Sequence, residues 1–439
     1  MAVGWCWPQS VLPGELVTLH VDGAPPERVE VVRDGLAPHT VWSAAGSSRE
    51  IPVGSFWQPG LYIVRLDGAA PTAWFLVRGT AAIVLELATN TWNAYNDSDG
   101  PNLYTGAVEL SFARPLALGM LAKNDATPRL VERSYGRSTR DQALTTWHGM
   151  AGWAGQERRF VRWAEANGVT LGYATNADLE DHPEVLDRCR LVLSVGHDEY
   201  WTWGMRDTVE GFVARGGNAA FLSGNTCYWQ VRIEGDVMVA YKHRYAEDPV
   251  QSHLTTTMWS DPITGRPEAA MTGMSFTRGG YHRIASSVPR GTGGYEVHRP
   301  EHWLLEGTGL RRGDQLGAAG PGGGGVVGYE CDGCDLTFVD GLPTGPDGLT
   351  VIATAPATPF DERTTPLPLA PGGRHELEFH ADRLGLAPEV LRHGHAVFGC
   401  RAGTGGTGTV VSVGCTDWAY GLDDPIVDQV TRNILARLS

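Results

Sequence analysis

Two buried strands joined by a helix, in the middle of the chain, limit the possible folds more than any other segment. Residues 191–195 and 218–222 are nearly continuous apolar runs, the pattern of strands covered on both faces of a sheet. Residues 204–215 between them predict a helix, and the two glycines that follow end it. Strand, helix and strand in this order form a βαβ unit, which places the two strand ends side by side. Ligands bind beyond such strand ends in open α/β sheets, so we expect the functional site there.

The alternation of strands and helices continues through most of the C-terminal part. We therefore expect a core domain at residues 81–439 with a doubly wound, mostly parallel α/β sheet of the flavodoxin-like kind. Residues 240–300 lack clear periodicity and should form an irregular cap, and residues 340–374, rich in Pro and Gly, should be peripheral. Further strands are predicted at 81–87, 169–174 and 408–414, helices at 156–167 and 424–437, and loops at 89–97 and 176–179.

The N-terminal part of the chain has a different character. Residues 8–80 contain short runs of β-branched and apolar residues separated by Pro-Gly turns. Several short strands with turn residues between them are typical of a sandwich, so residues 1–80 are predicted to be a small immunoglobulin-like β-sandwich. We expect this domain to pack against or cover the core domain.

Composition excludes several classes of partner and location. The net charge of −15 argues against a nucleic acid or an anionic membrane as a general partner. No stretch approaches the roughly 18 apolar residues of a membrane helix, and the N-terminal residues lack the pattern of a secretory signal. Seven cysteines, an odd number over a long chain, indicate reduced thiols and a cytoplasmic protein.

Polar and aromatic side chains follow both strands of the βαβ unit. Tyr200 and Tyr228 stand at equivalent positions, with His197 and Glu199 beside the first and Asn225 beside the second. Two phenols and a carboxylate suit a hard, highly charged cation. Because a free phenol has a pKa near 10, its ionisation at neutral pH needs a strong Lewis acid, and ferric iron meets that need better than magnesium or calcium.

Other residues compete for a catalytic role. Cys227 follows a strand in a Gly-Asn-Thr-Cys turn, as a nucleophile does in hydrolases, although the late strand offers no histidine partner. Cys331 and Cys334 form a lone CxxC without a second pair. An aromatic pocket without any metal is a further alternative, and it would be formed by Trp92, Trp201 and Trp229.

At these residues the chain resembles the family of the N,N-dimethylformamidase large, or beta, subunit and its relatives. The resemblance covers residues 80–439, and the N-terminal sandwich also fits the family. The matching motifs are Asn90–Asn96 with Leu103-Tyr104, Gly196–Trp201, Asn225–Trp229, Arg266–Glu268 with Thr272-Gly273, His302-Trp303 with Glu306–Gly309, Gly328–Glu330 and Asp417-Trp418.

The resemblance implies a class I amidotransferase-like core with one iron ion, expected rather than zinc, bound by two tyrosines and a glutamate. On this sequence the tyrosines would be Tyr200 and Tyr228, and Glu306 fits the third ligand best by order and spacing, with Glu330 as the other candidate. The implied reaction is hydrolysis of a C–N bond in a small amide or formamide by a metal-activated water. Candidate catalytic residues are His302 and Asp417 for proton transfer, Asn225 for the oxyanion, and His197 and Glu199 beside the metal.

The chain is much shorter than the dimethylformamidase large subunit, which puts dimethylformamide itself in doubt as the substrate. A small partner subunit or a homo-oligomer is compatible with the sequence. Three alternatives stay open: a metal-independent amidase that uses Cys227, a non-hydrolytic reaction at the same iron site, and a protein that binds a ligand without catalysis.

Overall fold

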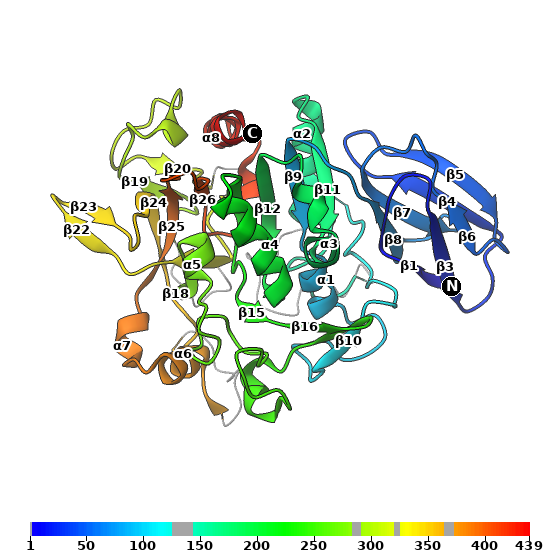
Figure 1. The fold of residues 1–439 in the computed structure, drawn as a ribbon, viewed down its shortest axis with the longest axis horizontal. Helices are drawn as coiled ribbons and strands as arrows, with labels where there is room; N and C mark the ends of the chain where they lie inside the picture. Colours follow the sequence, from blue (N-terminus) through cyan, green and yellow to red (C-terminus); the bar gives the residue numbers. More distant parts are fainter. Residues whose placement is uncertain (1, 125–143, 283–290, 320–324, 364–372) are drawn as a thin grey trace.

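The N-terminal eight strands form two sheets that share one apolar core (Figure 1, blue). The structure, a computed structural model, describes residues 2–124, 144–282, 291–319, 325–363 and 373–439. The three-stranded sheet has the order β1 (Val3–Trp7), β3 (Leu16–Asp22), β6 (Glu50–Pro52), and the five-stranded sheet the order β2 (Ser10–Val11), β8 (Ala73–Val77), β7 (Gly60–Leu66), β4 (Arg28–Arg33), β5 (His39–Ala45). The immunoglobulin-like type and the boundary at residue 80 stay predictions.

A nine-stranded sheet forms the centre of the remaining chain. Its strand order is β11 (Leu171–Thr175), β9 (Ile83–Leu87), β12 (Leu191–His197), β14 (Asn218–Gly224), β26 (Val410–Ser412), β25 (Gly394–Arg401), β24 (Thr350–Ala357), β19 (Tyr295–Val297), β20 (Gln315–Leu316). The pairs from β11 to β26 are parallel, whereas every pair from β26 to β20 is antiparallel. The sheet is therefore mixed, with one parallel and one antiparallel half.

The predicted doubly wound, mostly parallel sheet of the flavodoxin-like and amidotransferase-like kind is thus wrong. The prediction missed β24 and β25, which lie between residues 350 and 401 and pair antiparallel with each other. Most residues of β24 and β25 are buried, as in the parallel strands, but polar residues and a proline interrupt the apolar run of β24. Sequence periodicity reports burial and not strand direction, so the βαβ pattern of one half was extended to the other.

Side chains of the parallel strands alternate between two apolar layers. Leu85 and Leu193 face the helices α2 and α8, whereas Val84 and Val192 face the helix α4. Burial on both faces explains why these strands read as continuous apolar runs. The three helices are α2 (Glu157–Ala166), α4 (Trp203–Ala214) and α8 (Pro425–Leu438).

Most of the elements predicted for the parallel half are confirmed, with two differences. The segments expected as loops at 89–97 and 176–179 are the short helices α1 (Thr89–Tyr95) and α3 (Asn176–Asp181). Thr175 starts α3 with a capping box, since its hydroxyl accepts from the Asp178 N–H and the Asp178 carboxylate accepts from the Thr175 N–H. Both helices begin directly after the carboxyl ends of core strands.

The segment expected as a cap, residues 240–300, is only partly described, since residues 283–290 lie outside the described chain. It contributes β19 to the large sheet, while its strand β18 pairs with β21. The remaining elements are β10 (Glu109–Ser111), η2 (Pro183–Leu186), β13 (Tyr200–Trp201), β15 (Trp229–Gln230), β16 (Arg232–Glu234), β17 (Val237–Val239), η3 (Lys242–Glu247), α5 (Ala269–Thr272), β18 (Ser275–Tyr281), η4 (Trp303–Leu305), β21 (Glu330–Gly333), β22 (Thr337–Val339), β23 (Leu342–Thr344), α6 (Glu376–Leu384), α7 (Pro388–Leu391) and η6 (Trp418–Gly421).

Two global observations complete the fold. Among the described residues, none of the helices combines the length and the apolarity needed to cross a bilayer. The seven cysteines all lie in the described part of the chain, and each is a free thiol.

Candidate functional site

The two strand ends of the βαβ unit meet as expected. β12 and β14 pair in parallel along their whole length, and just beyond them Tyr200 of β13 pairs with Trp229 of β15. Gly196 turns the chain here with a φ of 93°, and a side chain at that position would lie 2.5 Å from Gln156. Asn225 and Cys227 also have positive φ angles, 49° and 56°, so the second strand end turns sharply as well.

A chain of hydrogen bonds runs from an ammonium group through two phenols to a carboxylate. Lys242 Nζ donates to the Tyr200 hydroxyl (2.8 Å), and this hydroxyl donates to the hydroxyl of Tyr104 (2.9 Å). The Tyr104 hydroxyl donates in turn to the carboxylate of Glu199 (2.9 Å). Tyr104 is 40% exposed, so part of this residue faces solvent. Burial lowers the pKa of Lys242 to about 8.

His197 joins two buried carboxylates. Its Nε2 lies 2.7 Å from Glu330 and 3.3 Å from Glu199, at ion-pair distance although the N–H does not point straight at either oxygen. Burial alone would lower the pKa of His197, but Glu330 and Glu199 raise it well above its usual value. The two carboxylates therefore favour the charged form of the His197 ring. Asn225 Nδ2 donates to the same Glu330 carboxylate (3.2 Å), which is thus held from two sides.

Tyr228 has a different partner. Its hydroxyl lies 2.5 Å from Nε2 of His380, which α6 carries one turn after Glu376. Burial lowers the pKa of His380 to about 3, so its ring is neutral and its Nε2 can accept a hydrogen bond from the Tyr228 hydroxyl. Glu376 accepts a hydrogen bond from Tyr281 (3.2 Å), and burial together with Glu330 and Glu199 raises its pKa to about 8.

The site holds more buried acid than buried base. Burial raises the pKa of Tyr200 well above its usual value, and the charges of Glu199, Glu330 and Tyr228 raise it further. Burial likewise raises the pKa of Tyr228, and the charges of four glutamates raise it further. These are Glu376, Glu268, Glu199 and Glu330. A multivalent cation would reverse each of these shifts, because it favours the ionised forms. Two phenols and a carboxylate that oppose one another's ionisation fit a hard cation such as ferric iron.

The described residues contain no group of three or more His, Cys, Asp and Glu side chains arranged to hold a metal. Tyrosine is not one of those four residue types, and tyrosines supply two of the three candidate ligands. Whether a metal ion fits these residues is therefore judged from the chemistry of the two phenols and the carboxylate and from the excess of negative charge around them.

The structure does not bring Glu306 and His302 to the tyrosines. The segment is a short 3-10 turn packed on α8, where Asn433 Nδ2 donates to the Glu306 carbonyl (2.8 Å). The Glu306 side chain is exposed, and His302 accepts from the Leu304 N–H (3.3 Å) as the cap of the turn. The third ligand expected at Glu306 is thus misplaced, because its sequence motif encodes a capped turn. Glu199 is the glutamate that contacts phenol groups, since it accepts hydrogen bonds from the hydroxyls of Tyr104 (2.9 Å) and Tyr95 (3.2 Å). Glu330 joins the same cluster through His197, and its charge acts on Tyr200 and Tyr228.

The structure gives less support to the catalytic roles predicted for Asp417 and Asn225 than to the site around Glu330. Asp417 is buried next to Gly328, two residues before Glu330, so it adjoins the strand that carries this carboxylate. The amide nitrogen of Asn225 already donates to Glu330, which engages the group predicted to bind an oxyanion. Both roles stay predictions.

The competing sites are disfavoured by burial. Cys227 is fully buried in an apolar cluster with Trp201, Phe221 and Trp259, and burial raises the pKa of its thiol well above the usual range. Trp201 lies in this cluster, whereas Trp92 and Trp229 belong to the other one, so the three tryptophans do not form one pocket. Cys331 and Cys334 are buried free thiols.

Residues of the site that were not predicted as site residues include Tyr104, Lys242, Glu376 and His380. Lys242 could have been noticed, because Lys123 is the only other lysine among the 35 lysines and arginines of the chain. Glu376 and His380 have the spacing of one helical turn. Nothing in the sequence places these residues near the tyrosines, since their segments are far apart along the chain.

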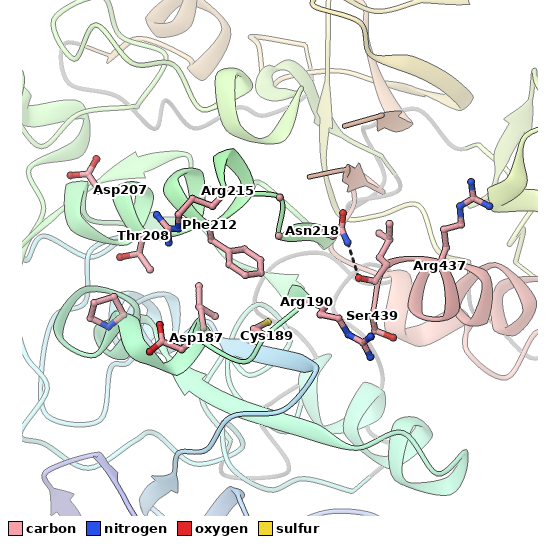
Figure 2. A pocket seen from close by; sticks show the side chains of 15 residues that line it. Asp187, Cys189, Arg190, Asp207, Thr208, Phe212, Arg215, Asn218, Arg437 and Ser439 are labelled. Carbon is pink, nitrogen blue, oxygen red and sulfur yellow. Dashed lines mark hydrogen bonds between the residues drawn. The ribbon is translucent and has the colours of Figure 1, made fainter. Parts of the chain in front are cut away.

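A cavity of about 720 Å³ opens at the opposite end of the parallel strands (Figure 2). It is lined by residues such as Arg190, Asn218 and Arg437, which lie at the amino ends of β12 and β14 and near the end of α8. None of the described residues that line it belongs to the tyrosine site. This cavity is therefore separate from the site around Tyr200 and Tyr228.

A buried pair of acids behind the site gives a pH-dependent prediction. Glu86 accepts from Asn176, while its second oxygen and one oxygen of Asp198 have no donor. Burial, and then Asp198, raise the pKa of Glu86 well above its usual value of 4.5. The folded state therefore binds this proton more tightly than the unfolded state, and stability falls as pH rises above that value.

Replacing Glu86 by glutamine should remove this loss, because the new amide can donate to Asp198. We expect Glu86→Gln to stabilise the protein by roughly 1–2 kcal/mol at pH 8 and by much less at pH 5. Urea unfolding at both pH values measures the difference. An equal effect at the two pH values would show that Glu86 is not linked to protons.

Comparison with known proteins agrees with the motifs. A profile of the family described as N,N-dimethylformamidase beta subunit-like, C-terminal, matches residues 25–432. The chain is 29% identical over 239 residues to the N,N-dimethylformamidase beta subunit of Alcaligenes sp, covering 49% of this chain and 29% of that protein. It is 27% identical over 301 residues to that of Paracoccus aminophilus, covering 63% and 36%. The matches thus span about a third of the length of these relatives.

Proposed function

This chain belongs to the N,N-dimethylformamidase beta subunit-like family, and from that premise we propose that it hydrolyses the C–N bond of a small amide or formamide with one ferric ion. One observation carries the proposal: two buried phenols, Tyr200 and Tyr228, share a site with Glu330 and an excess of buried carboxylates. We infer the class of reaction from the names of the two relatives, and the identity of the metal from the types of ligand.

Tyr200, Tyr228 and Glu330 would hold the ion. When bound there, a ferric ion would supply Lewis acidity, which lowers the pKa of a water molecule and polarises an amide carbonyl. His197 and Asn225 hold Glu330 in place through contacts of 2.7 Å and 3.2 Å. These contacts would fix the carboxylate before the metal arrives, as outer partners of metal ligands commonly do.

The entrance supports a small and uncharged substrate. Tyr104 is the most exposed of the residues described in the site, and its ring centre lies 5.5 Å from that of Trp147 and 4.4 Å from that of Tyr95. A planar amide can lie against such rings, whereas Lys242 just inside repels a second cation. Because both relatives are described as beta subunits, we also propose that the chain assembles with a further chain.

The decisive experiment is metal analysis of the freshly purified protein together with its visible spectrum and an amide hydrolysis assay. We expect about one iron per chain, a tyrosinate-to-iron absorption band, and loss of activity after treatment with an iron chelator. Protein that is colourless and cannot be loaded with iron would reject the metal mechanism.

The same preparations separate the rival functions. Iodoacetamide should leave activity unchanged, because the thiol of Cys227 is fully buried and protonated. Activity that survives the chelator but not alkylation would identify a cysteine amidase. Iron without hydrolysis of any tested amide would favour a non-hydrolytic reaction at the same site, and the absence of both would favour a binding protein.

A further inference from the structure

Lys242 occupies an unusual position beside the proposed metal site. Its backbone has a φ of 56°, in the left-handed region, and is fixed there by the hydrogen bond from its N–H to the Thr256 carbonyl (2.9 Å). Its side chain is buried, and Nζ lies 2.8 Å from the Tyr200 hydroxyl. A buried lysine in a strained backbone conformation needs a compensating interaction.

Aromatic rings surround the ammonium group. Nζ lies 3.4 Å from the ring centre of Tyr104, 5.2 Å from that of Trp229 and 5.4 Å from that of Tyr200. Cation–π attraction to several rings holds an ammonium group firmly when solvent is excluded. Arginine is by far the more common basic residue of this chain. At position 242 it would place a wide planar group where these rings leave room for a compact one.

We propose that Lys242 is a positioning residue, which fixes the phenol oxygen of Tyr200 and the ring of Tyr104 and so sets where one metal ligand stands. The inference rests on the proposed function in one respect, since it takes Tyr200 as a ligand. Lys242 donates to Tyr200, Tyr200 donates to Tyr104, and Tyr104 donates to Glu199, so the ammonium fixes the direction of the whole chain of hydrogen bonds. The ammonium group also lies over one face of the Tyr104 ring, and Tyr104 is 40% exposed.

The first test removes the side chain of Lys242 by substitution and then adds a soluble amine of the same shape. Glycine accepts a positive φ without strain, so Lys242→Gly is expected to keep the backbone and leave a cavity shaped like n-butylammonium. In iron-loaded protein, loss of a donor to a tyrosinate oxygen should move the absorption band to longer wavelength. Added n-butylammonium should restore the wild-type band, whereas the neutral isostere n-butanol should not.

The second test needs no iron. Reductive methylation of metal-free protein with formaldehyde and cyanoborohydride, followed by mass spectrometry, reports both lysines of the chain. Lys123, which donates to the His148 carbonyl (2.6 Å), serves as the internal reference. Tyr200→Phe should raise the labelling of Lys242 relative to Lys123 by about 10-fold, the effect of losing one hydrogen bond to a charged group.

The two tests separate failure of the inference from failure of the proposed function. An unchanged labelling ratio in Tyr200→Phe, or a Lys242→Gly band that equals wild type, overturns the positioning role. Wild-type protein that takes up no iron rejects the proposed function, while the labelling ratio still decides whether Lys242 holds Tyr200. Lys123→Gly is the matched control for the absorption experiment, and its band should equal that of wild type.

Discussion

Replacing Tyr228 by phenylalanine is expected to remove most of the iron and nearly all of the activity. The hydroxyl of Tyr228 is buried and bonded only to the neutral His380 among its described hydrogen-bond partners, so phenylalanine keeps the ring packing and deletes the donor oxygen. Loss of a direct ligand should weaken iron binding by about 100-fold or more, since loss of outer partners alone costs 10–100-fold. Iron content after dialysis and the intensity of the tyrosinate band measure the effect.

Tyr62→Phe provides the matched control for this experiment. The Tyr62 hydroxyl is also internal and donates to the Gln58 carbonyl (2.7 Å), but it lies in the N-terminal sandwich. Both variants should lose about 1 kcal/mol of stability with the hydrogen bond, and only Tyr228→Phe should lose iron. If the two variants retained equal amounts of iron, Tyr228 would not be a ligand.

The second large effect concerns the choice between two glutamates. Glu330→Gln should strongly reduce both iron binding and activity, because Glu330 is 5% exposed, contacts His197 and Asn225, and its charge acts on both phenols. Glu306→Gln should leave both properties as in wild type, because its exposed side chain lies on the turn that packs against α8. The two variants carry the same chemical change, so each serves as the control of the other.

The ratio of their iron contents after chelation competition decides the ligand. We expect at least a roughly 10-fold lower affinity in Glu330→Gln. The opposite order, with Glu306→Gln as the weaker binder, would place the ligand on the turn and contradict the arrangement of the fold. Circular dichroism of both variants confirms that the comparison is between folded proteins.

The parallel half of the sheet was predictable from the sequence for a definite reason. Its strands are buried on both faces and separated by amphipathic helices, so apolar runs and helical periodicity alternate along the chain. The antiparallel half lacks such spacing, because β24 and β25 are separated by α6 and α7 and yet pair directly. Strand direction there depends on how the chain returns to the sheet.

The residues of the candidate site also fall into two groups, those that local sequence could predict and those that only the fold brings together. Tyr200 and Tyr228 were predictable together, because one βαβ unit brings both strand ends to the same edge. Glu330, Lys242 and His380 come from three other segments, and the local motif around Glu306 pointed to a glutamate that lies on a distant turn. Contacts between residues about 100 positions apart, such as Asn225 with Glu330, leave no periodic trace in the sequence.

The sequence by itself determined the family, the buried strands of the parallel half and the two tyrosines at their ends. These features are local, since they depend on residue spacing within one strand–helix–strand unit and on motifs of a few residues. Only the tertiary structure decided the mixed sheet, the contact of Glu330 with His197 and the partners Lys242 and His380. Those features depend on which distant segments are buried against each other, and burial is also the main cause of the raised pKa values of Tyr200 and Tyr228.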